Sequence, residues 1–195
     1  GKILIATGGW PHIPKFPGSE LAISSNEVFD LEQFPARLAI IGGGYIAVEF
    51  AGIFNGLGAQ VTQLYRGPLF LRGFDADIRA HAAQEIGKTG VDLRFEVNVQ
   101  SITQSSGGLQ VLLTDGNRIE VDAVLYATGR KANLAGLGLE NVNVKIGDAG
   151  TIDVDAEYRT SEPNIFALGD VVGRMELTPV ALAEGMSFAR RQFGG

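Results

Sequence analysis

The sequence predicts an α/β fold in which a parallel sheet is joined by a three-stranded antiparallel meander. Three observations support this prediction. A buried strand is followed at once by a glycine-rich turn and an apolar helical pattern over 38–59. A second strand follows at 59–65, which completes a parallel βαβ unit of about 30 residues. Short alternating runs separated by turn residues then occupy 91–127, a pattern typical of antiparallel strands.

The composition is that of an ordinary globular protein. Of 195 residues, 45% are hydrophobic and 19% are charged, which is enough for one large or two small cores. The net charge of −6 argues against a general nucleic-acid binder, which would present a basic face to phosphates. The chain has no cysteine and only His12 and His81, so we expect neither a disulfide framework nor a zinc site. No apolar run approaches the roughly 20 residues of a membrane span, and we expect a cytoplasmic protein.

The turn Gly42-Gly43-Gly44-Tyr45-Ile46-Ala47 is the strongest local indication of function. The buried strand 38–41 precedes it, and a helix that runs to Gly58 follows it. Glycines in such a turn let a pyrophosphate approach the backbone, where free helix N–H groups and the positive end of the helix dipole receive it. The G-x-G-x-x-A spacing in this context therefore predicts a Rossmann-like dinucleotide site.

The end of the second strand indicates which dinucleotide is bound. NAD-binding units usually place Asp or Glu there for the ribose 2′-hydroxyl, whereas an Arg accommodates a 2′-phosphate. Here Tyr65 is followed by Arg66 and, six residues later, by Arg72, and no carboxylate appears before Asp75. Because guanidinium groups bind phosphate oxygens through charge-assisted bonds, we predict NADPH rather than NADH. The alternative is that both arginines are solvated loop charges.

The elements around this unit follow from local patterns. Lys2–Thr7 is predicted as a buried strand, and 10–33 as a connector with a helical turn near 25–31. Asp75 is predicted as the N-cap of a helix over Ala76–Lys88. The alternating runs form a three-stranded meander followed by a return strand that ends at Ala127; they are 91–97, 99–104, 109–114 and 118–127.

The last third of the chain is predicted to hold two short strands and a helix. The strands are Thr151–Val154 and Ile165–Leu168, and the Ala-rich helix covers Pro179–Gln192. The second strand delivers Asp170 at its carboxyl end, where ligands bind in open α/β sheets. Asp170 could bond a sugar or ribityl hydroxyl there, or it could cap the following turn.

Two strand ends share the sequence Ala-Thr-Gly, at 6–8 and 127–129. The βαβ region lies between them, which predicts one domain inserted between two crossing points of another. Coincidence in a chain with 27 glycines is the alternative.

Several motifs together resemble the pyridine nucleotide–disulfide oxidoreductases, and within them the glutathione reductase branch. The motifs are ATGG, IIGGGYIAVEFAGIFNGLG, R-x5-R-x-FD, ATGR, RTSEPNIFALGDV and ELTPVALAEG, in the family's order over nearly the whole chain. The resemblance implies a three-layer FAD/NAD(P)-binding fold. It also implies an oxidoreductase in which NADPH reduces FAD, and the flavin reduces a redox-active disulfide. That disulfide then reduces a small-molecule disulfide such as glutathione disulfide.

The resemblance implies roles for individual residues. The residues that line the pyrophosphate turn are Gly42, Gly43, Gly44, Ile46 and Ala47, and those that grip the 2′-phosphate are Arg66 and Arg72. Those near the nicotinamide or the bound nucleotide are Tyr45, Glu49, Gly129 and Glu176. Those matching FAD-binding positions are Asp170 and Thr178. No catalytic residue and no metal ligand are expected in this chain.

The domain organisation implied by the resemblance is discontinuous. Residues 1–9 end one segment of an FAD domain, 10–130 form the NADP-binding domain with a dinucleotide core at 36–130, and 131–195 form a second FAD segment. The family's first FAD motif, its cysteine pair and its C-terminal dimerisation domain have no counterpart here. We therefore expect a central fragment of a homodimeric enzyme that cannot perform the disulfide chemistry alone.

Three alternatives remain open. An NADH-linked enzyme similar to dihydrolipoamide dehydrogenase would need the acidic residue that is missing after Leu64. A flavin reductase without a disulfide, such as an NADH oxidase or a ferredoxin reductase, would lack the cysteine pair. The third alternative is a nucleotide-binding module without turnover. Within the NADPH branch, enzymes similar to trypanothione reductase or mercuric reductase also fit.

Overall fold

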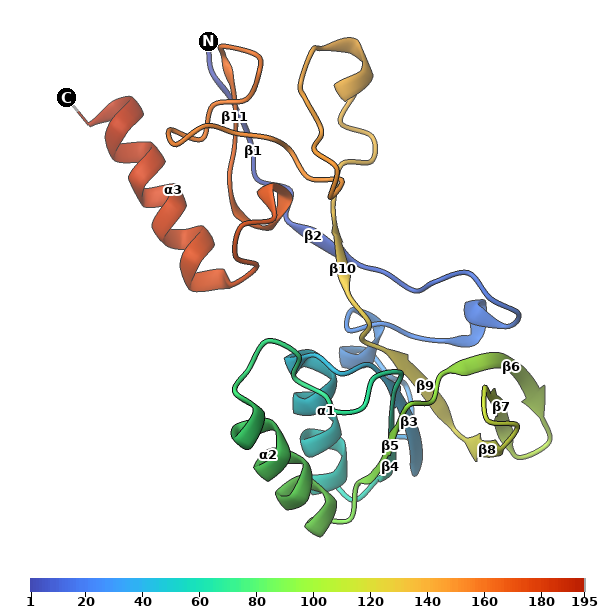
Figure 1. Cartoon of the computed structure of the whole chain (residues 1–195). Coiled ribbons are helices and arrows are strands. Elements are labelled where there is room, and N and C mark those ends of the chain that lie inside the picture. Colours follow the sequence, from blue (N-terminus) through green and yellow to red (C-terminus); the bar gives the residue numbers. More distant parts are fainter. Residues whose placement is uncertain (195) are drawn as a thin grey trace. The chain divides into compact units, whose positions relative to one another are not determined.

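The computed structural model describes residues 1–194 and divides the chain into two compact units (Figure 1). The first unit combines Gly1–Trp10 with the chain from Arg130 onward, and the second is the continuous stretch Pro11–Gly129. Both boundaries come shortly after an Ala-Thr-Gly sequence.

The second unit is built on a four-stranded parallel sheet in the order β5-β4-β3-β9. Its strands are Asp92–Phe95 (β5), Gln60–Tyr65 (β4), Arg37–Ile41 (β3) and Ala123–Tyr126 (β9). The central strand β3 places Ile41 opposite Leu64 on β4 and Tyr126 on β9. Its last four residues are buried, as expected for a parallel strand covered on both faces. Helices Tyr45–Gly56 (α1) and Ala76–Lys88 (α2) follow β3 and β4.

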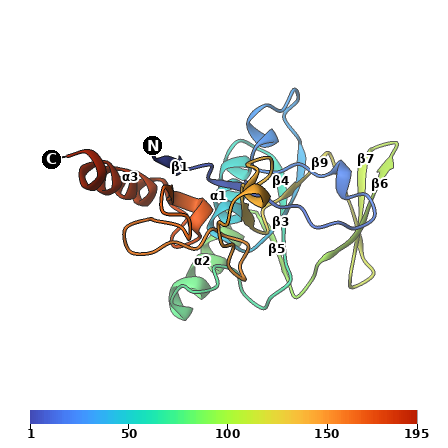
Figure 2. The same cartoon turned by 90° about the horizontal axis from the view of Figure 1, so that it is seen from above.

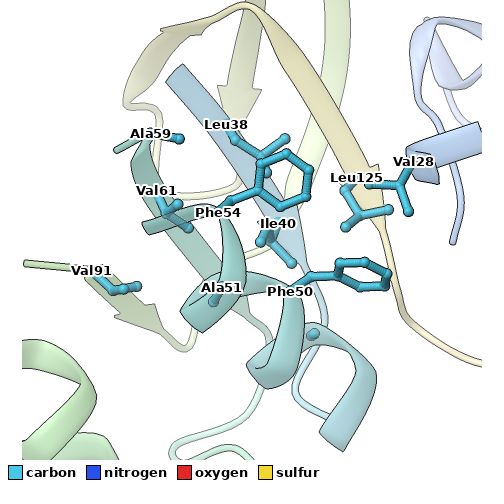
Figure 3. Close-up of a cluster of buried hydrophobic side chains, with 11 residues drawn as sticks. Val28, Leu38, Ile40, Phe50, Ala51, Phe54, Ala59, Val61, Val91 and Leu125 are labelled. Atoms are coloured by element: carbon cyan, nitrogen blue, oxygen red, sulfur yellow. The ribbon is translucent and has the colours of Figure 1, made fainter. Parts of the chain in front are cut away.

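Two hydrophobic cores cover the two faces of this sheet, because successive side chains of a strand point to opposite sides. On one face, Leu38 and Ile40 pack with Phe50 and Phe54 of α1 (Figure 3). On the other face, the alternate residues of β3 pack against the meander. Figures 1 and 2 both draw the helices on one side of the sheet and the meander on the other. The predicted three-layer Rossmann-like α/β fold is confirmed.

The meander differs in part from the prediction. Its antiparallel strands, in the order β6-β7-β8, are Val99–Ser105, Gly108–Leu113 and Arg118–Val121. The run at 91–97 instead supplies β5 of the parallel sheet, and the run at 118–127 holds β8 and β9 rather than one return strand. The chain changes direction at Asp122, whose carboxylate accepts hydrogen bonds from the Arg37 backbone N–H (2.8 Å) and guanidinium (2.5 Å).

The first unit contains two short two-stranded pairings and one long helix. Ile3–Ile5 (β1) pairs in parallel with Ile165–Ala167 (β11), and Gly9–Pro11 (β2) pairs with Arg130–Ala132 (β10). Helix Thr178–Phe193 (α3) packs Phe188 against Phe166, with ring centroids 5.1 Å apart.

Single helical turns complete the chain, at Ser19–Leu21, Glu27–Phe29, Leu139–Asn141 and Gly169–Val172. The strand predicted at Thr151–Val154 is wrong. Ile152 makes only an isolated bridge to Ile146, because its N–H donates instead to the Val171 carbonyl (3.0 Å). Among residues 1–194, no helix combines the length and apolar character that crossing a membrane would require.

Candidate nucleotide-binding site

The glycine turn between β3 and α1 leaves the first N–H groups of the helix free. Gly44 is the N-cap, with extended backbone and no side-chain cap. The first helical hydrogen bond runs from the Val48 N–H to the Gly44 carbonyl (3.2 Å). The N–H groups of the three residues between them, 45–47, therefore have no partner in the described part of the chain. No acidic side chain occupies the first turn, so the positive end of the helix dipole can receive an anion.

Close contacts explain the first two glycines of the turn. A Cβ on Gly42, whose φ is 150°, would lie 2.3 Å from the Ala127 carbonyl oxygen. A Cβ on Gly43 would lie 2.4 Å from the Tyr65 ring, and one on Gly67 would lie 2.8 Å from the same ring. The Tyr65 ring therefore lies against two glycine backbones, which can approach it only because they lack side chains.

The loop after β4 carries Arg66 and Arg72, and both side chains are exposed. Neither guanidinium has a hydrogen-bond or ion-pair partner within residues 1–194. Arg79 on α2 differs, because its Nε donates to the Phe70 carbonyl at 2.7 Å and its Nη2 donates to the Leu69 carbonyl at 2.5 Å. The loop therefore carries two arginines without partners in the described residues, and Arg79 of α2 is hydrogen-bonded to its backbone.

Backbone hydrogen bonds connect this loop to the glycine turn and to the residue that follows β5. The Leu71 N–H donates to the Gly43 carbonyl at 2.6 Å, and the Glu96 N–H donates to the Gly67 carbonyl at 3.1 Å. Phe70 is fully buried and packs edge-on against a β5 aromatic ring, with centroids 5.6 Å apart. The free arginines are thus carried on a segment with a defined position relative to the turn.

The residues predicted near the nicotinamide or the bound nucleotide are exposed. Tyr45 is 43% exposed, and Glu49 lies one helical turn further along α1, so both belong to the same helix face. Gly129 is the last residue of the second unit, and its carbonyl accepts a hydrogen bond from the His12 N–H (3.0 Å). Glu176 is exposed and belongs to the first unit.

A hollow of about 200 Å³ in the first unit brings Asp170 and Thr178 together. Its other lining residues are Ala6, Gly8, Leu168, Gly169 and Ala181. It lies where β1 and β11 end, which is the edge of an α/β sheet that binds ligands. The Gly169 N–H donates to Glu184 Oε2 at 2.8 Å, so a side chain of α3 holds the turn beside Asp170.

No group of three or more His, Asp or Glu side chains in residues 1–194 is arranged to hold a metal ion. Burial raises the pKa of the Tyr126 phenol, whose ring lies 5.3 Å from that of Phe16 in the core of the second unit. Tyr126 packs with residues of the meander, so its role is in the hydrophobic core of the second unit.

The family comparison agrees with the geometry. The family described as Pyridine nucleotide-disulphide oxidoreductase matches residues 1–185. The chain belongs to this family. The resemblance predicted from the motifs is therefore confirmed.

Individual members show how similar the chain is to the family. It is 55% identical over 193 residues to a glutathione reductase of Burkholderia cepacia, covering 99% of this chain and 43% of that protein. It is similar to the HOCl-induced flavoprotein disulfide reductase RclA from Escherichia coli, with a TM-score of 0.93, 34% identity, and 99% and 45% of the two chains covered.

A further similar structure is an engineered water-forming NADPH oxidase bound to NADPH. The TM-score is 0.87, the identity is 28%, and the match covers 97% of this chain and 46% of the oxidase. This chain thus spans less than half the length of the family members that it matches.

Several groups around the glycine turn and the hollow are not indicated by the sequence motifs. The Tyr65 ring packs against the backbone of Gly67 and of the turn. The glycine at position 67, two residues after the end of β4, is the one sequence feature that indicates this packing. The Leu71 N–H contributes through its backbone alone, so residue type gives no indication of its role. Glu184 lies 15 residues from Gly169, and only the fold brings the two together.

Proposed function

We propose that this chain is the NADPH-binding central part of a flavoprotein disulfide reductase of the glutathione reductase type. One observation carries the proposal: the glycine turn with free N–H groups is hydrogen-bonded, through Leu71, to the loop that bears two unpartnered arginines. NADPH offers two anionic groups to such an arrangement. Its pyrophosphate fits the turn, and its 2′-phosphate fits Arg66 and Arg72.

The choice of NADPH over NADH is supported by the residues at the end of β4. The oxidase bound to NADPH carries a Gly→Ala substitution and, eighteen positions later, an Asp→Ala substitution. An Ala→Arg substitution follows directly, and a Pro→Arg substitution lies six positions beyond it. The same spacings separate Ala47, Tyr65, Arg66 and Arg72 in this chain. Removal of a carboxylate and addition of two cations is the change that a 2′-phosphate favours.

The hollow in the first unit supports a second cofactor contact. Asp170 could accept hydrogen bonds from sugar or ribityl hydroxyls of FAD, and Thr178 lies on the same hollow at the start of α3. When bound, NADPH would supply a hydride, and FAD would relay its two electrons to a disulfide. In the second unit we assign Tyr45, Glu49 and Gly129 to the nicotinamide side of the nucleotide, and in the first unit we assign Glu176 the same role.

The complete protein would then reduce a small-molecule disulfide such as glutathione disulfide. Within it, 10–130 is the NADP-binding domain, and 1–9 and 131–195 are segments of the FAD domain. A cytoplasmic location and a homodimeric assembly belong to the same proposal. The 195 residues contain no cysteine, so this chain alone would bind nucleotide without reducing a disulfide.

Isothermal titration with NADPH and NADH tests the proposal. We expect tighter binding of NADPH, and loss of that preference when Arg66→Ala and Arg72→Ala are combined. Each lost charge-assisted contact should cost roughly tenfold in NADPH affinity. Arg118→Ala, at an exposed position of β8, is the matched control and should change neither affinity. Equal binding of the two nucleotides by the unmodified chain would contradict the proposal.

A further inference from the structure

We propose that Gln63 is a positioning residue that turns the N–H groups of the glycine turn toward the pyrophosphate. The inference rests on the proposed function, because it concerns how the turn binds that group. Gln63 lies on β4 and is only 2% exposed. Its Nε2 donates a hydrogen bond to the Gly42 carbonyl at 3.1 Å.

The two carbonyls of the turn are both tied by donors from the β4–α2 segment. Gln63 binds the Gly42 carbonyl, and the Leu71 N–H binds the Gly43 carbonyl at 2.6 Å. In a trans peptide the carbonyl and the following N–H point in opposite directions. The N–H groups of Gly43 and Gly44 are therefore directed away from these donors, and neither has a partner among residues 1–194. Together with the N–H groups of residues 45–47 at the start of α1, they give the turn a run of backbone donors without partners in the described residues, which suits an anion.

Packing alone does not explain an amide at this position. Gln63 is opposite Ile40 on β3 and Leu93 on β5, so its neighbours along the sheet are aliphatic. Its Oε1 is buried without a hydrogen-bond partner in the described residues. A leucine would fill a similar volume and would leave no such orphan, which normally destabilises a fold. The amide therefore contributes something that an aliphatic side chain could not, and the Gly42 carbonyl is what it contacts.

The first test compares Gln63→Leu with the unmodified chain against three ligands. Without its donor, the Gly42 carbonyl must rotate toward another partner, and the nucleotide must rotate it back on binding. We expect NADPH and NADH affinity to fall together by about tenfold, with their ratio unchanged. Adenosine 2′-monophosphate has no pyrophosphate, so its affinity should not change. Unchanged NADPH affinity would overturn the inference, and so would an equal loss for adenosine 2′-monophosphate, which indicates general loosening of the unit.

The second test uses Gln63→Glu and a pH series. A protonated carboxyl can donate to the Gly42 carbonyl, whereas an ionised one would repel it, and burial raises the pKa of such a group. We expect NADH affinity of this variant to approach that of the unmodified chain at low pH and to fall as pH rises. The inference would be overturned if the ratio of the NADH affinity of Gln63→Glu to that of the unmodified chain did not change with pH.

The two proposals fail in different ways. If the unmodified chain binds neither nucleotide, the proposed function fails. If it binds NADPH in preference to NADH while both Gln63 variants behave like the unmodified chain, only the role of Gln63 fails.

Discussion

The Arg79 guanidinium donates from Nε to the Phe70 carbonyl at 2.7 Å, and so connects α2 to the loop that carries Arg72. Arg79 is partly buried, whereas Arg66 and Arg72 are exposed and unpartnered among residues 1–194. Arg79, which we do not expect to contact nucleotide, therefore fixes the loop that carries Arg66 and Arg72.

Arg79→Ala should lower NADPH affinity by roughly fivefold to tenfold, because two loop carbonyls lose a charge-assisted donor and the loop loses its fixed position. NADH affinity should change less, since it does not depend on the 2′-phosphate contacts. Isothermal titration with both nucleotides checks this, with Arg79→Lys as a partial replacement that can serve one carbonyl. An equal loss for both nucleotides would place the effect on the whole unit instead of the loop.

Gly43→Ala should destabilise the second unit by about 1–3 kcal/mol, the usual effect of overpacking. The new Cβ would lie 2.4 Å from the Tyr65 ring, so the ring or the turn must move. Gly44→Ala is the matched control, because a Cβ there meets nothing within 4 Å, and it should stay within about 0.5 kcal/mol. Denaturant unfolding measures both. Gly43→Ala combined with Tyr65→Ala should be less destabilised than the sum of the single variants, and strict additivity would contradict the contact.

Asp122 should make the stability of the second unit depend on pH at the acid end. A hydrogen bond from the Arg37 guanidinium is the main cause that lowers the pKa of Asp122. Because the folded pKa lies below the unfolded value of about 3.9, the stabilisation is present above that value and is lost as pH falls through the folded pKa.

Asp122→Asn should therefore lower the melting temperature at neutral pH, and the difference from the unmodified chain should shrink as pH falls through the folded pKa of Asp122. Thermal melts of both proteins across this range provide the measurement. Asp148→Asn, at an exposed position, serves as the control. Melting curves of Asp122→Asn that stay parallel to those of the unmodified chain on acidification would refute this explanation.

Glu184→Leu should destabilise the first unit by about 1–3 kcal/mol, because the Gly169 N–H loses its acceptor. Glu184→Gln keeps a side-chain oxygen of the same reach and should cost less. Hydrogen exchange at the Gly169 amide distinguishes the two directly, since only the leucine variant should speed it. Equal exchange in both variants would mean that this hydrogen bond does not protect the turn.

The parts of the fold that could be predicted from sequence depend on local patterns. The aliphatic run before Gly42 and the helical pattern after it define β3 and α1 without distant information. Asp75 was also recognisable, and its carboxylate accepts hydrogen bonds from the Asp77 and Ile78 N–H groups at 3.0 and 3.3 Å. The division between β8 and β9 was not, because it depends on a contact between Asp122 and Arg37, 85 residues away.

In the candidate site, too, some residues could be predicted from local sequence patterns and others could not. The glycines of the turn and the two arginines stand out by residue type and spacing, so they could be named before the structure. The Tyr65 ring beside Gly43 could not, because nothing in a tyrosine at a strand end says which backbone it touches. Contacts made by backbone groups, such as the Leu71 N–H, cannot be predicted from residue type, because every residue except proline has such an N–H group.

The pairing of β1 with β11 sets an order of events during synthesis of the chain. Ile3 lies opposite Ile165, so β1 has no pairing partner until β11 has been made. The continuous stretch Pro11–Gly129 is complete well before β11 leaves the ribosome, where chains grow at about 5–20 residues per second and domains fold as units. The inserted unit therefore folds first, and by folding it brings the two distant segments of the other unit to the same place, which shortens the loop that their pairing must close.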